Sequence, residues 1–359
     1  MVRILMCGPI ERSGGVSTHT KYITKYLEES GATVILYNQS PERALPNPFS
    51  VFVKLSRRTY LLLFQGIKRK KYYDILHTQV SGGIFSFISA VTGCLISKIC
   101  NKKFVVTFHY RPSKRFINSY KSLFWYVLKH SDVFFVVSKK QKSLIKETFH
   151  NSLKEILVIP NGFDRNTFKP MNKNSCRKSL NLPDNKKILI SVGNLVEIKG
   201  YNYLIDAVEQ IVRFRKDIIC LIIGSGPFKE KIEKQIEKAY LEEYVKIIGQ
   251  IKHNEIPVWI NACDIFVLPS LNEGNPTVMF ECLGCGKPFI GTKVGGIPEI
   301  ITSEDYGFLV EPGDPKDLER KILMALEKKW DHVKIMDYSQ QFTWKKITHE
   351  ILKAYEKCI

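Results

Sequence analysis

Short apolar runs alternate with amphipathic segments along almost the whole chain. In the first half, the segments 17–29 and 86–100 have the apolar spacing of helices. The apolar runs between such segments predict strands at 3–7, 34–37, 74–77, 104–108, 133–137 and 156–159. An alternation of strands and helices is typical of a parallel, doubly wound sheet with helices on its faces.

A polar and irregular stretch, 166–182, interrupts this pattern, and we place the linker between two domains there. After it, the predicted strands are 188–192, 218–223, 245–248, 265–268 and 289–292, and the predicted helices are 201–215, 229–240 and 256–262. The expected fold class is α/β, with two Rossmann-like doubly wound domains at 1–167 and 168–340. The tail predicts a last helix with Trp344 and Tyr355 on one apolar face, which needs a surface to cover.

The segment 269–296 carries the strongest candidate chemistry. A polar loop with Glu273 follows the strand 265–268, and Pro276 is expected to be the first residue of the next helix. Because the first N–H groups of a helix have no partner inside it, this helix start is a candidate anion site. Glu273 and Glu281 suit sugar hydroxyls at the carboxyl end of a strand, although solvated loop and helix positions would also explain their spacing.

Other loops at the predicted carboxyl ends of strands add weaker signals. Gly14-Gly15 precedes a helix and would let the backbone approach a phosphate, although a plain turn is an equal alternative. Lys199 lies in the loop after the strand 188–192, where it could hold a phosphate as a point charge. His109 ends the strand 104–108 and is either a ligand-facing or a structural histidine.

Composition limits the class of protein. The 359 residues are enough for two cores, and no apolar run approaches the ~20 residues of a membrane span. The first ten residues predict a strand rather than a secretory signal, so we expect a cytoplasmic protein. Of the nine cysteines, only Cys282 and Cys285 are close, and their place in a predicted helix favours packing over a redox or metal pair.

Positive charge is concentrated in the first half of the chain. Residues 1–165 hold 26 Lys+Arg against 9 Asp+Glu, whereas the remaining residues hold 28 against 26. A one-sided basic domain indicates an anionic partner, such as a membrane surface or a phosphorylated substrate, or else a solvated basic face. The segment 51–73 mixes aromatic, aliphatic and basic residues without an acid, as interfacial helices do, but a core helix with a basic outer face is the alternative. We expect no nucleic-acid partner, since no motif for one is present.

With these residues in view, the chain resembles retaining glycosyltransferases of family GT4, which have the GT-B fold of two Rossmann-like domains facing a cleft. The resemblance covers nearly the full length. The strongest motif is E-x7-E from Glu273 to Glu281, matched without insertion. The other matching motifs are Gly14-Gly15 with His19, His109, Pro160 to Asp164, Gly193 to Gly200 and Gly224 to Pro227.

The resemblance implies roles for individual residues. Lys199 would hold the diphosphate of a nucleotide-sugar, Glu273 its sugar and Glu281 its ribose, and His109 would lie by the donor sugar. The implied catalytic residues are therefore His109, Glu273 and Lys199. Further implied donor contacts are Gly15, Asn194, Gly224, Ile251, Gly274, Asn275, Pro276 and Thr277. The helix 341–359 would pack back on the first domain.

One position departs from the family pattern. Many members have Arg where this chain has Asn194, which brings no charge, so Lys199 would carry more of the charge of the leaving diphosphate.

The implied reaction is transfer of a hexose from a UDP- or GDP-sugar to a hydroxyl, with retention of configuration. The chain has no DxD triplet, and we expect neither a metal nor another cofactor. A lipid-linked or membrane-associated glycan is the expected acceptor, with the protein peripheral on the inner face of the membrane. The alternatives are a phosphorylase- or epimerase-like GT-B enzyme, or a non-catalytic protein that binds a nucleotide-sugar.

Overall fold

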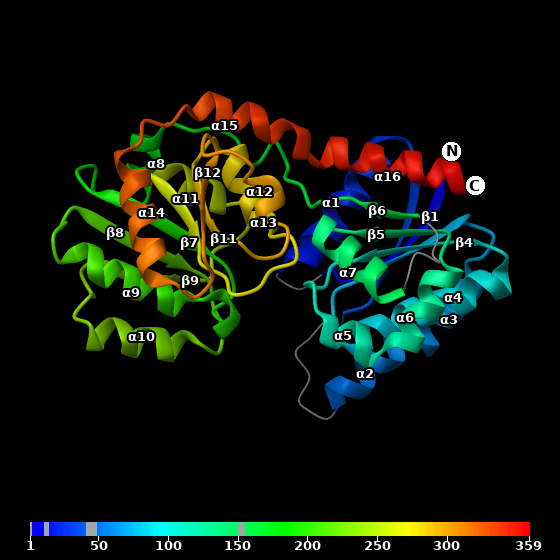
Figure 1. Ribbon diagram of the computed structural model, residues 1–359. Helices are drawn as coiled ribbons and strands as arrows, with labels where there is room; N and C mark the ends of the chain where they lie inside the picture. Colours follow the sequence, from blue (N-terminus) through cyan, green and yellow to red (C-terminus); the bar gives the residue numbers. More distant parts are fainter. Residues whose placement is uncertain (1, 11–13, 41–48, 150–154) are drawn as a thin grey trace. The chain divides into compact units, whose positions relative to one another are not determined.

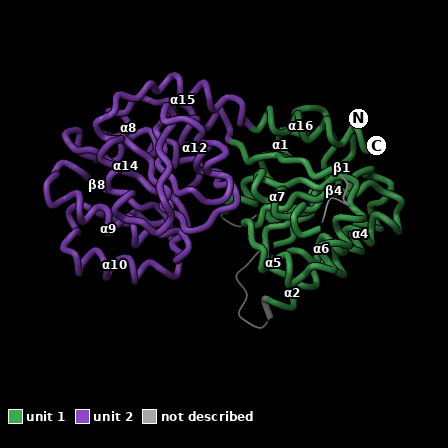
Figure 2. Tube along the Cα trace, viewed as in Figure 1, with its two compact units in different colours: residues 1–162, 344–359 green, residues 163–343 purple. Residues whose placement is uncertain are grey.

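The computed structural model describes residues 2–10, 14–40, 49–149 and 155–359. The chain divides into two compact units (Figure 2). Unit 1 contains residues 1–162 and 344–359, and unit 2 contains residues 163–343.

Unit 1 is a six-stranded parallel sheet with helices on its faces (Figure 1). Its strands are β1 (Arg3–Gly8), β2 (Thr33–Asn38), β3 (Ile75–Val80), β4 (Lys103–Phe108), β5 (Val133–Val136) and β6 (Ile156–Val158), in the order β2-β1-β3-β4-β5-β6. Its helices are α1 (Gly15–Glu29), α2 (Phe49–Arg58), α3 (Tyr60–Lys68), α4 (Ile84–Cys100), α5 (Lys114–Ser119), α6 (Lys121–His130), α7 (Lys139–Phe149) and α16 (Trp344–Cys358). The order of strands reverses between β1 and β3, which is where such sheets place a ligand crevice.

Alternate residues of β1 enter the cores on the two faces of the sheet, as the period of two requires. Leu5 and Cys7 pack in one cluster, and Ile4 and Met6 in the other. The second cluster also contains the apolar face of α16, including Trp344, Ile347, Ile351 and Tyr355, all buried. The tail helix therefore covers this face of the first unit's sheet, beside α1.

Unit 2 repeats this architecture. Its strands are β7 (Lys187–Val192), β8 (Ile218–Ile223), β9 (Val245–Gly249), β10 (Ile265–Leu268), β11 (Phe289–Thr292) and β12 (Gly307–Val310), parallel and in the order β12-β11-β10-β7-β8-β9. Its helices are α8 (Lys173–Ser179), α9 (Tyr201–Val212), α10 (Lys229–Lys238), α11 (Ile256–Ala262), α12 (Thr277–Gly284), α13 (Ile297–Ile300), α14 (Pro315–Glu327) and α15 (His332–Ser339), with 3-10 turns at Glu197–Lys199 and Gln340–Phe342. Here the order of strands reverses between β7 and β10.

The expectation of an irregular linker at 166–182 is wrong. Unit 1 ends at Gly162, and the stretch contains α8, which belongs to unit 2. The polar residues of this stretch predicted a solvated linker, but Arg177 is buried, at only 2% exposure, with its charge paired. Its guanidinium donates to Asp264 at 2.7 Å and to the backbone carbonyls of Ala262, Pro183, Asp184 and Lys186.

Of two smaller expectations, one is wrong and one is confirmed. Pro276 is the N-cap of α12 rather than its first helical residue, and Thr277 begins the helix. Cys282 and Cys285 are buried and free, as expected of helix-packing residues.

Candidate active site

The candidate site of unit 2 lies where the loops after β7 and β10 leave the sheet, at its switch point. The two loops are joined by a backbone hydrogen bond, from Leu271 N to Ile198 O at 2.8 Å. Gly200 makes this approach possible: its φ is +67°, and a Cβ there would lie 2.1 Å from the Pro269 carbonyl oxygen. The side chains carried by the two loops are therefore held close together.

Lys199 and Glu273 form an ion pair across these two loops. Lys199 Nζ donates to Glu273 Oε1 at 2.5 Å, and both side chains are largely shielded, at 20% and 11% exposure. Ser270, fully buried, donates its hydroxyl to the same carboxylate oxygen at 2.7 Å. Lys199 and Glu273 were predicted from the sequence, but Ser270 was not. Its position two residues after β10 and three residues before Glu273 was the available signal.

Glu281 lies on α12 and is buried, with His253 as its partner. Its Oε1 lies 2.8 Å from His253 Nε2, and the His253 ring lies 5.2 Å from that of Phe168. His253 was not singled out from the sequence, although it follows β9, another strand whose carboxyl end belongs to this edge of the sheet. His253 donates its Nε2–H to this carboxylate, whose oxygens can also accept from the hydroxyls of a polar ligand.

The other residues predicted for unit 2 occupy varied environments. Asn275 and Pro276 are buried at the start of α12, a helix with no side-chain cap. The backbone carbonyl of Gly274 accepts a hydrogen bond from Gly296 N at 2.8 Å, which fixes this part of the loop. Asn194 is exposed, and Ile251 packs at the edge of the core.

Gly224 holds the loop after β8 against the loop after β7. A Cβ at this position would lie 1.9 Å from the Gly193 carbonyl oxygen, so only glycine fits.

In unit 1, His109 follows β4 and pairs with a residue of the neighbouring strand. Its Nε2 lies 2.7 Å from Gln79 Oε1. Because an amide oxygen only accepts, Nε2 carries the proton and Nδ1 is left as the acceptor. Burial and the neighbouring imidazoles hold the pKa of His109 well below its ordinary value, so the ring is neutral. Gln79 was not predicted from the sequence.

His19 of α1 lies edge-on against His109, with the ring centroids 4.2 Å apart. Its Nδ1 donates to Asn161 Oδ1 at 2.8 Å, and its Nε2, fully buried, has no hydrogen-bond partner among the described residues. Burial lowers the pKa of His19 to about 4, although the bond to Asn161 opposes the shift.

A third buried histidine extends this cluster to the tail helix. His77 lies with its Nδ1 2.5 Å from the hydroxyl of Tyr355 on α16 and with its Nε2 2.7 Å from that of Thr107. Burial, with the neighbouring His19, lowers the pKa of His77 to about 3. Gln79 Nε2 lies 3.3 Å from His77 Nε2, so polar contacts run from α16 to His109.

Gly15, the remaining predicted residue, is exposed as the first residue of α1. The preceding Gly14 has a φ of +141°, and α1 has no side-chain cap. This helix start therefore presents backbone donors of the kind that bind anions.

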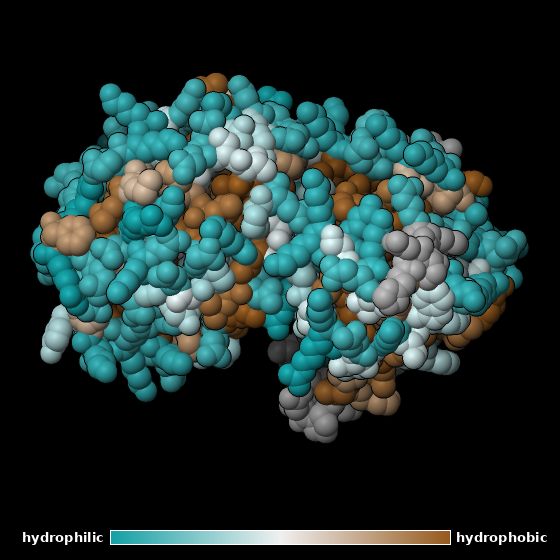
Figure 3. Space-filling view, viewed as in Figure 1, coloured by the Kyte–Doolittle hydropathy of each residue, from teal (hydrophilic) through white to brown (hydrophobic). Residues whose placement is uncertain are grey.

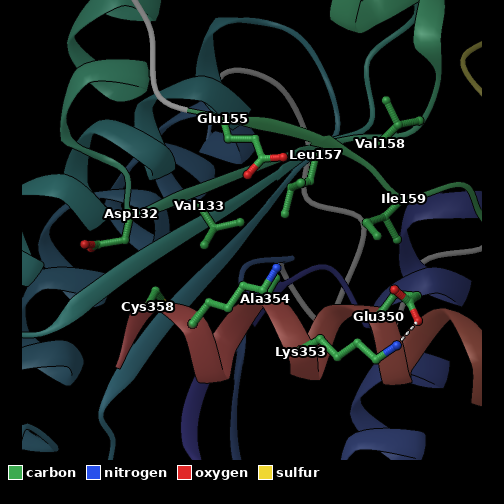
Figure 4. Close-up of a pocket in the computed structure, with 11 residues that line it drawn as sticks. Asp132, Val133, Glu155, Leu157, Val158, Ile159, Glu350, Lys353, Ala354 and Cys358 are labelled. Carbon is green, nitrogen blue, oxygen red and sulfur yellow. Dashed lines mark hydrogen bonds and ion pairs between the residues drawn. The ribbon is translucent and has the colours of Figure 1, made fainter.

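A separate groove of about 350 Å³ lies between the edge strand β6 of unit 1 and α16 (Figure 4). Its lining includes Asp132, Glu155 and Lys353, with Lys353 ion-paired to Glu350 at 2.9 Å. None of the site residues predicted from the sequence lines this groove, so it takes no part in the candidate site.

Each unit offers its own polar chemistry. Unit 2 provides a shielded ammonium–carboxylate pair, a second carboxylate and an uncapped helix start, which together suit a ligand with both anionic groups and hydroxyls. Unit 1 provides a neutral imidazole fixed in one tautomer.

Comparison with known protein families identifies both halves of the chain. Residues 172–356 match the family model of glycosyl transferases group 1, and residues 13–167 match that of glycosyltransferase family 4. The first model alone covers more than half of the chain.

Individual relatives agree with this assignment. An uncharacterized glycosyltransferase of Methanocaldococcus jannaschii is 26% identical over 96% of this chain and 95% of its own. The UDP-Gal:alpha-D-GlcNAc-diphosphoundecaprenol alpha-1,3-galactosyltransferase of Escherichia coli is 30% identical over 72% of this chain and 67% of its own.

Solved structures show the same fold. The sucrose-phosphate synthase of Thermosynechococcus elongatus has a TM-score of 0.83 at 20% identity, covering 99% of both chains. Anabaena HepE, solved with UDP-glucose, has a TM-score of 0.78 at 20% identity, covering 99% of this chain and all of its own. The chain therefore belongs to the glycosyl transferases group 1 of family GT4 and is a glycosyltransferase with the GT-B fold.

Proposed function

We propose that this protein moves a hexose from a UDP- or GDP-sugar to a hydroxyl of a lipid-linked or membrane-associated glycan, with retention of configuration and without a metal. The observation that carries the proposal is the Lys199–Glu273 pair at the switch point of unit 2. It places one cation and one carboxylate side by side, as a diphosphate attached to a sugar requires.

Lys199 is proposed to hold the diphosphate of the donor. When the bond from the anomeric carbon to the phosphate breaks, negative charge develops on the leaving diphosphate, and preorganised donors aimed at it lower the barrier. The ammonium of Lys199 and the first N–H groups of α12 are such donors, and they supply positive charge where other enzymes use a metal. Asn194 is exposed and uncharged, so Lys199 is the principal positive charge in these two loops.

The carboxylates are proposed to bind the hydroxyls of the donor. Glu273 would exchange its bond to Lys199 for hydroxyls of the sugar, while Ser270 keeps the carboxylate oriented. Glu281 would accept from the ribose, and Ile251 would pack against the base. Two comparisons support a uridine donor: HepE was solved with UDP and UDP-glucose, and the Escherichia coli relative is named for UDP-galactose.

For His109 we propose a contact with the donor sugar. Its neutral ring can accept at Nδ1 from a sugar hydroxyl, because Gln79 holds the proton on Nε2. We propose retention by departure and attack on the same face of the sugar, because the sequence presents no nucleophile aligned for a covalent intermediate. The name of the Escherichia coli relative, with its diphosphoundecaprenol acceptor, supports the proposed lipid-linked acceptor.

Donor hydrolysis tests this proposal. The protein is incubated with a panel of UDP- and GDP-sugars, and the released nucleotide is measured. We expect release from one nucleotide class, abolished in Glu273→Gln and Lys199→Ala. A matched control is Lys293→Ala, which removes an exposed, ion-paired lysine of the same unit. Equal release by all variants, or none by the wild type with any donor, would contradict the proposal.

A further inference from the structure

Exposed apolar side chains are concentrated on one part of unit 1. Thirteen of the nineteen large hydrophobic residues that are exposed among the described residues lie between positions 51 and 125. They come from α2, α3, α4 and α6 and from the turn after α3, and contacts join α4 to each of the other three helices. Figure 3 shows part of this surface as brown atoms over α2, at the lower edge of unit 1.

Helix α3 shows most clearly that this surface is left uncovered by the described part of the chain. One side packs closely on α4, because a Cβ at Gly66 would lie 2.8 Å from a side-chain carbon of Ile96. The opposite side presents Tyr60, Leu61 and Phe64, of which Tyr60 is 70% and Phe64 51% exposed. A helix that is apolar on all sides is normally buried or in contact with lipid. Exposed apolar surface of this extent marks an interaction site.

The same region is strongly basic. Residues 49–131 contain 15 Lys+Arg and a single acid, Asp74. Asp74 is itself neutralised, because it pairs with Arg3 at 2.7 Å and with Lys102 at 3.7 Å. The segment therefore keeps a large excess of positive charge, although Lys102, Lys103 and Lys114 are paired with acids.

We propose that the outer faces of α2, α3 and α4 form a docking surface for an anionic lipid bilayer, into whose interface Phe52, Tyr60, Leu61 and Phe64 insert. The inference deepens the proposed function, since it names the surface that would bring the protein to a membrane-associated acceptor.

The arrangement of charge around α3 matches a lipid interface. The run Lys68-Arg69-Lys70-Lys71 lies at the carboxyl end of the helix, next to its exposed apolar face. Lys68 Nζ lies 5.9 Å from the centre of the Phe64 ring, so the charge borders the apolar surface. Long basic side chains place their stems along apolar groups and their heads among lipid phosphates. Among the described residues, no helix is both long and apolar enough to cross a bilayer.

The composition of the surface favours lipid over other anionic partners. Aliphatic side chains such as Leu61, Ile67, Leu95 and Ile99 gain nothing from a phosphate backbone, which is bound by polar and basic groups. A protein interface would be depleted of charge at its core. An anionic bilayer uses both properties, with about 1 kcal/mol, or about fivefold in affinity, for each basic residue near its surface.

Vesicle flotation tests the inference with the full chain and without any donor. The probes are vesicles of phosphatidylcholine alone and of phosphatidylcholine with about one third phosphatidylglycerol. We expect flotation with the anionic vesicles only, weakened at high salt. Leu61→Ser with Phe64→Ser should lower the partition coefficient at least tenfold, and replacing residues 68–71 by Gln should do the same. The matched control is Phe214→Ser with Tyr240→Ser, which removes two exposed aromatic residues from unit 2 and should float as the wild type does.

Three outcomes would overturn the inference: no flotation with either vesicle, flotation of the α3 variants equal to that of the wild type, or a change from oligomer to monomer in the α3 variants without vesicles, which would identify a protein interface. Donor hydrolysis measured without lipid separates this inference from the proposed function. Failure of flotation with hydrolysis intact contradicts the docking surface alone, and the reverse result contradicts the proposed transferase activity alone.

Discussion

Acidification below pH 6.5 should destabilise unit 1. His19 and His77 are fully buried in its core, and burial lowers the pKa of the first to about 4 and of the second to about 3. An unfolded histidine has a pKa of ~6.5, so between pH 6.5 and 4 the unfolded chain binds protons that the folded unit excludes. The stability contributed by these residues is therefore complete above pH 6.5 and is lost as the pH falls towards 4.

The loss of unfolding free energy that is due to His19 follows from its pKa values in the folded and unfolded chain. At 1.36 kcal/mol per pH unit, the difference between ~6.5 and about 4 corresponds to about 3 kcal/mol, of which about 2.5 kcal/mol is lost by pH 4.5. A single domain is stable by only ~5–15 kcal/mol, so this loss is large.

Urea unfolding between pH 7.5 and 4.5, followed by the fluorescence of Trp344, measures the effect, since the Trp344 ring lies 5.2 Å from that of His19. We expect the free energy of unfolding of unit 1 to fall steeply below pH 6.5 in the wild type. In His19→Gln, which keeps a donor for Asn161, the fall should be about 2.5 kcal/mol smaller at pH 4.5. His349→Gln replaces an exposed histidine of the same helix as Trp344 and should behave as the wild type. An unfolding free energy of the wild type that does not change with pH in this range would refute the role of the buried histidines. So would a His19→Gln variant that retains the full pH dependence.

Three further substitutions have predicted outcomes. Tyr355→Phe leaves the buried Nδ1 of His77 unpaired and should cost ~1–3 kcal/mol in urea unfolding, whereas Tyr240→Phe, at a position 86% exposed, should stay within ~0.5 kcal/mol of the wild type. Arg177→Met leaves buried carbonyls and Asp264 without the guanidinium and should destabilise unit 2 by ~3–5 kcal/mol, visible as a lower urea midpoint. Glu281→Gln removes a charged acceptor and should weaken nucleotide binding ~10- to 100-fold in calorimetric titration; unchanged affinity would exclude the ribose contact.

The elements of the sheets were largely predictable because their strands are buried on both faces and read as unbroken apolar runs. The run Ile265–Leu268 shows this, since it matches β10 at both ends. The strand β12, Gly307–Val310, was missed: it lies at the edge of its sheet, and because it begins with glycine its apolar run has only three residues. The polar stretch around Arg177 was misassigned, because sequence polarity does not distinguish a solvated side chain from a buried charge that is paired.

The candidate site was predictable in part for a similar reason. Lys199 and Glu273 lie in different loops 74 residues apart, but both loops follow strands of one parallel sheet, whose carboxyl ends share an edge. Ser270, His253 and Gln79 support the predicted residues through individual hydrogen bonds, to Glu273, Glu281 and His109 respectively. Such contacts depend on side-chain conformation, which no periodicity in the sequence encodes.

The same limit applies to the docking surface. The sequence showed that the segment 51–73 is apolar and basic, but whether it is core or surface depends on how α3 packs. The close approach of Gly66 to Ile96 buries one side of α3 and leaves the aromatic side exposed.

The most direct test of the assigned donor site is calorimetric titration of UDP and GDP into the wild type, Lys199→Ala and Lys293→Ala. We expect one nucleotide to bind the wild type and Lys293→Ala with equal affinity. Lys199→Ala should bind it at least tenfold more weakly, because a charged contact to phosphate contributes ~1.5–3 kcal/mol. Equal binding by Lys199→Ala, or no binding of either nucleotide to the wild type, would contradict the assignment of this site.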